Sequence, residues 1–144
     1  MDKAVNQGLD ERLFNYIVNA NQAAPYYQML GIKTRVLSPG YAELVVWADT
    51  RHTNPVGRVH GGLVASLADA AMTNAVRSLG YKCVTVEYSV SLMAAPTLDQ
   101  ELVGQGRVVK SGRNLFFVES LVLSADKPVA QAKGVFFNTG LVDI

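Results

Sequence analysis

The sequence contains one cysteine, Cys83, and only two histidines in 144 residues. A single cysteine excludes an internal disulfide, and two histidines without a matching acidic cluster predict no metal site. Runs of like charge are also absent. Thirteen Lys and Arg residues oppose twelve Asp and Glu residues, scattered along the chain, for a net charge of +1. This pattern excludes the basic surface typical of nucleic-acid-binding proteins.

Long apolar runs are absent as well. No segment is long enough to cross a membrane, and residues 1–7 lack the apolar core of a signal peptide. We therefore expect a cytoplasmic protein without membrane contact. Charged residues make up only 17% of the chain and apolar residues 49%. Because so small a protein has a large surface for its volume, part of its apolar surface is expected to be buried against another subunit.

The order of predicted elements indicates an α+β domain with one long helix packed on a mostly antiparallel sheet. Apolar periodicity and β-branched composition separate the elements, and Ser38-Pro39-Gly40, Pro96, Ser111-Gly112 and Asp126-Lys127-Pro128 mark the turns. Helices are expected over residues 9–20, ending between Asn21 and Pro25, and over residues 60–78. Strands are expected over residues 32–38, 41–49, 83–95, 101–110, 115–124 and 129–138.

The helix expected over residues 60–78 has two different faces. The face expected to pack on the sheet consists of Leu63, Val64, Leu67, Ala68, Ala71 and Ala75. The opposite face is a narrow polar stripe of Gly62, Ser66, Asp69, Thr73 and Arg77, flanked by small and apolar residues. Asp69 is the only acid between His52 and Tyr81. In such surroundings burial can shift the pKa of a carboxyl, although an ordinary solvent-facing aspartate is the alternative.

The loop before this helix contains His60-Gly61-Gly62. Two glycines at a helix start allow a ligand to approach the backbone closely. Their free N–H groups, at the positive end of the helix dipole, can bind a carbonyl oxygen that gains negative charge. The same turn also occurs for steric reasons alone. Together with an acid further along the helix, however, it indicates a catalytic site.

The motif His52-Thr53-Asn54-x-x-Gly57-x-x-His60-Gly61-Gly62, followed by Leu67-Ala68-Asp69, resembles hotdog thioesterases of the phenylacetate-degradation (PaaI-like) type. The 4-hydroxybenzoyl-CoA thioesterases and the eukaryotic acyl-CoA thioesterase 13 group share it, with the aspartate nine residues after the histidine. The resemblance extends over roughly residues 30–140. It includes the strand Val84-Thr85-Val86-Glu87, which ends at Pro96, and the turn Lys110-Ser111-Gly112-Arg113.

The resemblance implies a role for each matching residue. Gly61 would donate its N–H to the thioester oxygen, and Asp69 would activate water or attack the carbonyl directly. Asn54 would help to hold the carbonyl or the water, and His60 would brace the loop through hydrogen bonds. Thr73 could orient water.

Further roles are implied around this centre. Thr85 matches a strand hydroxyl that assists in some members. Lys110 and Arg113 would contact the CoA phosphates, and Gly62 would also line the CoA site. Between Val86 and Pro96 the sequence is one residue longer than some relatives, which predicts a β-bulge.

The resemblance also implies a hotdog fold, in which an antiparallel sheet wraps a long central helix, with an extra N-terminal helix. Residues 1–25 would form an N-terminal helical extension and residues 26–144 a single thioesterase domain. The implied reaction is hydrolysis of aryl or fatty acyl-CoA to free acid and CoA, without a cofactor. The active unit would be a homodimer within a homotetramer, in which Asp69 of one chain faces the Asn54–Gly61 loop of the other.

Hydrolysis through an aspartate has several alternatives. Cys83 as a nucleophile is disfavoured because a lone cysteine is usually a small buried residue. A serine nucleophile has no Gly-x-Ser-x-Gly turn to support it. A hotdog hydratase or dehydratase would use a histidine as base, whereas His60 precedes two glycines. A non-catalytic acyl-CoA-binding domain would be expected to lack Asp69 or to be fused to a DNA-binding segment.

Overall fold

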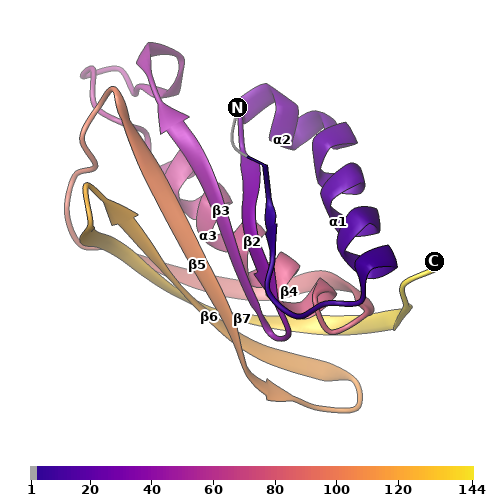
Figure 1. The fold of residues 1–144 in the computed structure, drawn as a ribbon. Helices are drawn as coiled ribbons and strands as arrows, with labels where there is room; N and C mark the ends of the chain where they lie inside the picture. Colours follow the sequence, from indigo (N-terminus) through magenta and orange to yellow (C-terminus); the bar gives the residue numbers. More distant parts are fainter. Residues whose placement is uncertain (1–2) are drawn as a thin grey trace.

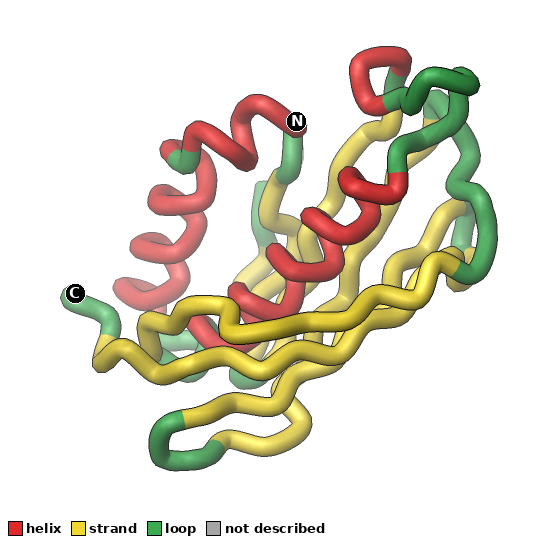
Figure 2. The backbone as a smooth tube through the Cα atoms, turned by 180° about the vertical axis from the view of Figure 1, so that it is seen from behind, coloured by secondary structure: helices red, strands yellow, loops and turns green. Residues whose placement is uncertain are grey.

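The computed structural model describes residues 3–144, which form one curved seven-stranded sheet and three α-helices (Figure 1). The strand order is β1-β2-β3-β5-β6-β7-β4; β1 and β2 pair in parallel and the other five neighbouring pairs are antiparallel. The long helix α3 (Gly61–Arg77) lies along the concave side of the sheet, as Figure 2 shows from behind. The predicted α+β class is confirmed. No helix described between residues 3 and 144 is long and apolar enough to cross a membrane.

The N-terminal helix ends within the predicted range, but a second helix that was not predicted follows it. Helix α1 (Glu11–Ala23) begins after Asp10, whose carboxylate accepts a hydrogen bond from the Leu13 N–H at 3.4 Å. It continues through residues 21–23, and a second helix, α2 (Pro25–Leu30), follows at once. Ala24 is extended because a residue before proline is driven out of the helical region, and a proline at the first helical position then starts α2. The predicted end between Asn21 and Pro25 is therefore confirmed, whereas α2 was not predicted.

The predicted strands are present, with boundaries within three residues of those expected. One predicted turn is misplaced: Pro128 lies inside β7. The turn before it consists of Ala125 and Asp126, with φ angles of 48° and 62°, as in a two-residue hairpin turn of the primed type. The register of β6 and β7 shifts beside Pro128, so its missing N–H falls at an irregularity of the ladder. The strands are β1 (Val5–Asn6), β2 (Lys33–Ser38), β3 (Tyr41–Ala48), β4 (Tyr81–Leu92), β5 (Gln100–Ser111), β6 (Leu115–Ser124) and β7 (Lys127–Leu141).

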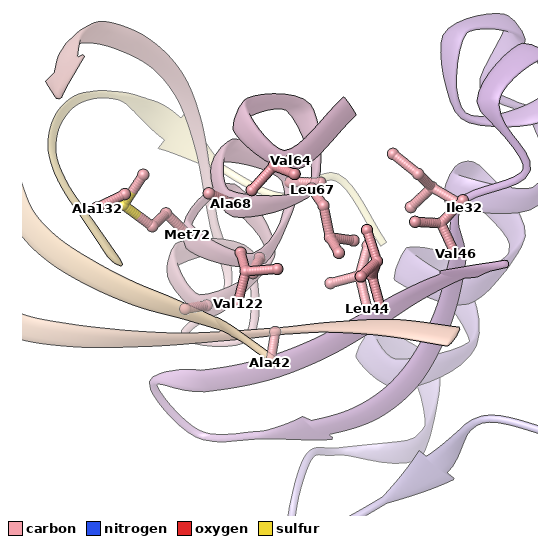
Figure 3. Close-up of a cluster of buried hydrophobic side chains, with 14 of the residues drawn as sticks. Ile32, Ala42, Leu44, Val46, Val64, Leu67, Ala68, Met72, Val122 and Ala132 are labelled. Carbon is pink, nitrogen blue, oxygen red and sulfur yellow. The ribbon is translucent and has the colours of Figure 1, made fainter. Parts of the chain in front are cut away.

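The core lies between α3 and the sheet, and two glycines of β5 bring the helix backbone close. A Cβ atom at Gly106 would overlap the Ala71 carbonyl, and one at Gly104 would lie 3.1 Å from the Leu67 carbonyl oxygen. Side chains of β3, β6 and β7 pack around the helix (Figure 3). The predicted buried face is confirmed, since each of its residues is at most 4% exposed: Leu63, Val64, Leu67, Ala68, Ala71 and Ala75.

A buried polar network attaches the N-terminal helices to α3. The Asn74 side chain donates to the Tyr27 hydroxyl at 3.2 Å and to the Ala70 carbonyl at 2.8 Å. Its oxygen accepts hydrogen bonds from Asn21 at 3.0 Å and from Arg77 at 2.8 Å, and Arg77 also donates to the Asn21 oxygen at 2.7 Å. Because buried amides must be paired, this network fixes α1 and α2 in one position on α3.

Candidate active site

The two glycines at the start of α3 differ in their hydrogen bonds. The Gly62 N–H donates to His60 Nδ1 at 2.7 Å, so the His60 ring caps the helix, and the neutral ring carries its proton on Nε2. This is the bracing contact expected of His60. The Gly61 N–H, at the first helical position, has no acceptor within residues 3–144. The expectation that both N–H groups are free is therefore wrong for Gly62, and Gly61 is the free donor.

The loop before His60 is closed on itself by Asn54. The Asn54 oxygen accepts the N–H groups of Val56 and Arg58, each at 3.0 Å, and the Asn54 N–H donates to the Arg58 carbonyl at 2.7 Å. In the part of the chain described, the Asn54 Nδ2 group has no partner. Asn54 can therefore still donate to a carbonyl or a water. The end of the loop is held by a bond from the His60 N–H to the His52 carbonyl at 2.8 Å.

Asp69 lies half-buried on the face of α3 that points away from the core. One of its oxygens, Oδ1, accepts a hydrogen bond from the Thr85 hydroxyl of β4 at 2.9 Å. Burial raises the pKa of Asp69, and the Thr85 hydrogen bond opposes this by a smaller amount. The other oxygen, Oδ2, has no hydrogen bond among the described residues. A carboxylate oriented through one oxygen, with a raised pKa, is typical of a general base or nucleophile.

A β-bulge in β4 turns a second side chain toward Asp69. Val86 is the extra residue between the paired positions Thr85 and Glu87. Because of it, Thr85 and Tyr88 face the same side of the sheet, whereas residues three apart in a regular strand face opposite sides. The pKa of Tyr88 is raised mainly by burial and then by the charge of Asp69. The β-bulge expected between Val86 and Pro96 lies at Val86, at the very start of that range.

The remaining candidates lie apart from this centre. Thr73, one turn beyond Asp69, is half-buried and makes no side-chain hydrogen bond within the described chain. Lys110 and Arg113 are exposed at the other end of the sheet from Gly61, because β5 runs along α3 toward its C-terminal end and its hairpin with β6 extends beyond (Figure 1). In one chain they do not meet Gly61.

Cys83, the alternative nucleophile, is a free and partly buried cysteine. Burial raises the pKa of its thiol to about 11, with smaller effects of Arg77, which lowers the pKa, and of Asp69, which raises it. At neutral pH very little thiolate is present, and the thiolate is the reactive form. Across residues 3–144, no three His, Cys, Asp or Glu side chains gather in a group that could hold a metal ion.

Gly61 and Asp69 lie in a segment of the chain that is shared with known proteins. A profile of the Thioesterase superfamily matches residues 56–130, more than half of the chain. The chain belongs to this superfamily. The matched stretch includes Gly61, Asp69 and Thr85 but neither α1 nor α2. A domain of unknown function also matches residues 11–80.

Relatives agree on the fold of this thioesterase. Human acyl-coenzyme A thioesterase 13 is 28% identical over 130 residues, which cover 87% of this chain and 93% of the relative. The PaaI protein of the Escherichia coli phenylacetic acid degradation operon has a TM-score of 0.86 at 20% identity, covering 94% and 99% of the two chains. A hypothetical thioesterase of Streptococcus pneumoniae, solved with coenzyme A, has a TM-score of 0.74 at 25% identity, covering 78% and 91%. The thioesterase therefore has the PaaI-like hotdog fold.

Sequence reasoning missed two tyrosines near the Asp69 carboxylate of this thioesterase. Tyr26 lies on the unpredicted helix α2, and its hydroxyl is 2.6 Å from that of Ser66. Ser66 belongs to the predicted polar stripe, and this was the one feature of the sequence that could have pointed to a partner such as Tyr26. Tyr88 faces the site only because of the bulge at Val86, and its own residue type carried no signal.

Proposed function

We propose that this thioesterase hydrolyses acyl-CoA to the free acid and CoA without a cofactor, with Asp69 as general base or nucleophile and Gly61 as oxyanion donor. The observation that carries the proposal is one helix with a free N–H at its start and, at Asp69, a half-buried carboxyl of raised pKa. The substrate class is supported by the human acyl-coenzyme A thioesterase relative and by the streptococcal structure with coenzyme A.

The chemistry needs little more than these two groups. A thioester carbonyl is electrophilic, and the thiolate leaves readily. The Gly61 N–H stabilises the negative charge that develops on the carbonyl oxygen, and one such donor contributes about 3–4 kcal/mol in other hydrolases. Asp69 Oδ2 takes a proton from water or attacks the carbonyl; general-base catalysis contributes on the order of 10²- to 10⁴-fold in rate. Thr85 fixes the carboxylate through Oδ1.

The two groups belong to one site only if two chains supply them. Gly61 and Asp69 are eight residues apart on α3, which is roughly 12 Å along the helix, too far for one carbonyl to contact both. Strand β4 forms an edge of the sheet and exposes apolar side chains. The exposed fractions of Val84, Val86 and Leu92 are 54%, 58% and 57%. Such an edge pairs readily with another strand. Antiparallel pairing of two β4 strands would bring Asp69 of one chain opposite Gly61 of the other in a homodimer.

The test of the reaction is a screen of acyl-CoA thioesters, with released thiol as the signal and EDTA present throughout. Hydrolysis of at least one acyl group is expected. Binding without thiol release would favour the non-catalytic acyl-CoA-binding domain, and hydration of an enoyl-CoA would favour the hydratase. A single turnover in ¹⁸O-water tests for direct attack, because label in Asp69 requires a mixed anhydride whose Asp69 carbonyl is attacked by water.

The Thr85 hydroxyl is predicted to set the pH range in which Asp69 is active. Its hydrogen bond lowers the pKa of Asp69, so Thr85→Val should raise that pKa further. Because the ionised carboxylate is the active form, the acidic limb of the kcat/KM profile should shift to higher pH. The control is Thr139→Val, an exposed threonine of β7 without a hydrogen bond to Asp69. An acidic limb that stays in place in Thr85→Val would contradict the assignment.

Arg113 is predicted to contact the nucleotide phosphates. In the proposed dimer, the hairpin that carries Lys110 and Arg113 lies beyond the C-terminal end of the same α3 that supplies Asp69, on the side of the partner's Gly61. Arg113→Ala should therefore raise KM for an acyl-CoA more than KM for the same acyl group on a short thiol without a nucleotide. Equal effects on both substrates would argue against a phosphate contact.

A further inference from the structure

Hydroxyl groups of α2 and α3 meet on the helix face that carries Asp69. Tyr26 of α2 and Ser66 of α3 have their oxygens 2.6 Å apart. Ser66 precedes Asp69 by three residues, so the two side chains are neighbours on one helix face. Tyr88 of β4 faces the same side of the sheet as Thr85, which donates to Asp69. Burial raises the pKa of Tyr88 most, followed by the charges of Asp69 and Tyr26.

Helix α2 holds Tyr26 in a fixed position. On one side of Tyr26, the Tyr27 hydroxyl accepts a hydrogen bond from buried Asn74 at 3.2 Å. At the end of α2, the Leu30 carbonyl accepts a hydrogen bond from His52 Nε2 at 2.8 Å, while His52 Nδ1 accepts from the backbone at 3.0 Å. His52 is itself buried, at 5% exposed. A six-residue helix anchored at Tyr27 by the buried network and at Leu30 by His52 presents the Tyr26 ring as a rigid surface.

The direction of the substrate follows from the two ends of α3. Ser66 and Tyr26 lie on the N-terminal side of Asp69, whereas Lys110 and Arg113 lie beyond the C-terminal end. A thioester at Asp69 whose nucleotide points toward Lys110 and Arg113 therefore points its acyl group toward Ser66 and Tyr26. This step rests on the proposed function, because it assumes an acyl-CoA substrate attacked through Asp69.

We propose that Tyr26 is the end wall of the acyl site, held by Ser66, and that α2 thereby restricts this thioesterase to compact acyl groups. An aromatic ring that is fixed in place cannot move aside for additional methylene groups without breaking its contacts. Tyr26 does not touch the reacting atoms. It is a specificity-determining residue supplied by a helix outside the superfamily match.

The test compares dodecanoyl-CoA with butanoyl-CoA. In Tyr26→Ala, the ratio of kcat/KM for the long over the short substrate should rise by roughly tenfold or more, the size of effect seen when a pocket gains room for a few methylenes. Tyr26→Phe keeps the ring and should change the ratio by less than about threefold. Tyr26→Trp enlarges the wall and should change the ratio in the opposite direction. Tyr16→Ala is the matched control, because Tyr16 is an exposed tyrosine of α1, at 36%.

The outcomes separate this inference from the proposed function. A wild-type protein that hydrolyses no acyl-CoA overturns both. A wild-type protein that hydrolyses acyl-CoA, with the same chain-length ratio in the Ala and Trp variants, overturns the end wall alone. Tyr26 is 52% exposed, so the Ala variant should fold, as thermal melting and gel filtration will show. If the Ala variant does not fold, the Trp variant tests the proposal, because it should lower the ratio of kcat/KM for the long over the short substrate.

Discussion

Asp69→Asn is expected to lower kcat for acyl-CoA hydrolysis by roughly two to four orders of magnitude. In the wild-type protein the Thr85 hydroxyl donates a hydrogen bond to Asp69 Oδ1 at 2.9 Å. The asparagine oxygen can accept the same hydrogen bond, so the geometry around the position should persist. An amide, however, neither takes a proton from water at neutral pH nor attacks a thioester carbonyl. The rate of thiol release at saturating substrate measures the loss, and gel filtration checks that the oligomer is unchanged.

The same substitution is expected to raise the melting temperature at neutral pH. Burial raises the pKa of Asp69 above its ordinary value of 3.8, so the folded state binds the proton more tightly than the unfolded state. The free energy of unfolding therefore falls as the pH rises from the ordinary pKa through the raised one. The amide of the variant carries no charge and avoids this loss, so the difference in melting temperature between variant and wild type should shrink in acid.

The control for both measurements is Asp143→Asn. Asp143 is exposed and forms a surface ion pair with Lys82 at 3.3 Å, so its substitution makes the same change in charge at a solvated position. It should leave turnover and melting temperature nearly unchanged. If Asp69→Asn retained near-normal turnover, Asp69 would have no part in the mechanism.

The central helix and the strands could be predicted because their signals are local. The apolar residues of α3 repeat with the helical period, and its buried face was correct at each position, from Leu63 to Ala75. Strand composition and turn residues located the six longer strands in the same way. The candidate site residues Asp69 and Gly61 lie on this well-defined helix, where the polar stripe and the paired glycines drew attention to them and the family resemblance supplied their roles.

What could not be predicted depends on contacts between distant residues. Helix α2 is too short to show a period and exists because Tyr27 and Leu30 bond to Asn74 and His52. The two-residue strand β1 pairs only with β2 and carries no pattern of its own. The pairing of the Gly62 N–H with the His60 ring likewise depends on a side-chain rotamer. Sequence patterns reveal periodic elements, whereas α2, β1 and the Gly62–His60 contact depend on individual hydrogen bonds.

Gly61→Pro is expected to lower kcat by about 10²- to 10³-fold, the effect of losing one oxyanion donor in other hydrolases. Gly61 is the first residue of α3, where proline is well tolerated because the N–H has no intrahelical acceptor. His60 before it has φ −67° and ψ 134°, the extended conformation that a residue preceding proline adopts. The substitution should therefore remove the free N–H and leave the helix intact, which circular dichroism can verify.

Gly61→Ala is the matched control for this loss. A Cβ atom at Gly61 would lie 2.7 Å from Leu92 Cδ1, the flexible end of a side chain that can move. Both variants introduce that atom, but only the proline removes the N–H. The ratio of their kcat values therefore isolates the contribution of the hydrogen bond. Equal kcat values for the two variants would remove the Gly61 N–H from the mechanism.

Mixing Gly61→Pro chains with Asp69→Asn chains tests whether two subunits share each site. Neither variant alone has a complete site. In a mixed dimer, however, one site receives Asp69 from the first chain and Gly61 from the second, while the other site carries both defects. Random re-assortment of equal amounts should restore about a quarter of the wild-type sites, because half of the dimers are mixed and each has one intact site. Mixed dimers that form without regaining activity would mean that a single chain supplies both groups, which the separation of roughly 12 Å along α3 argues against.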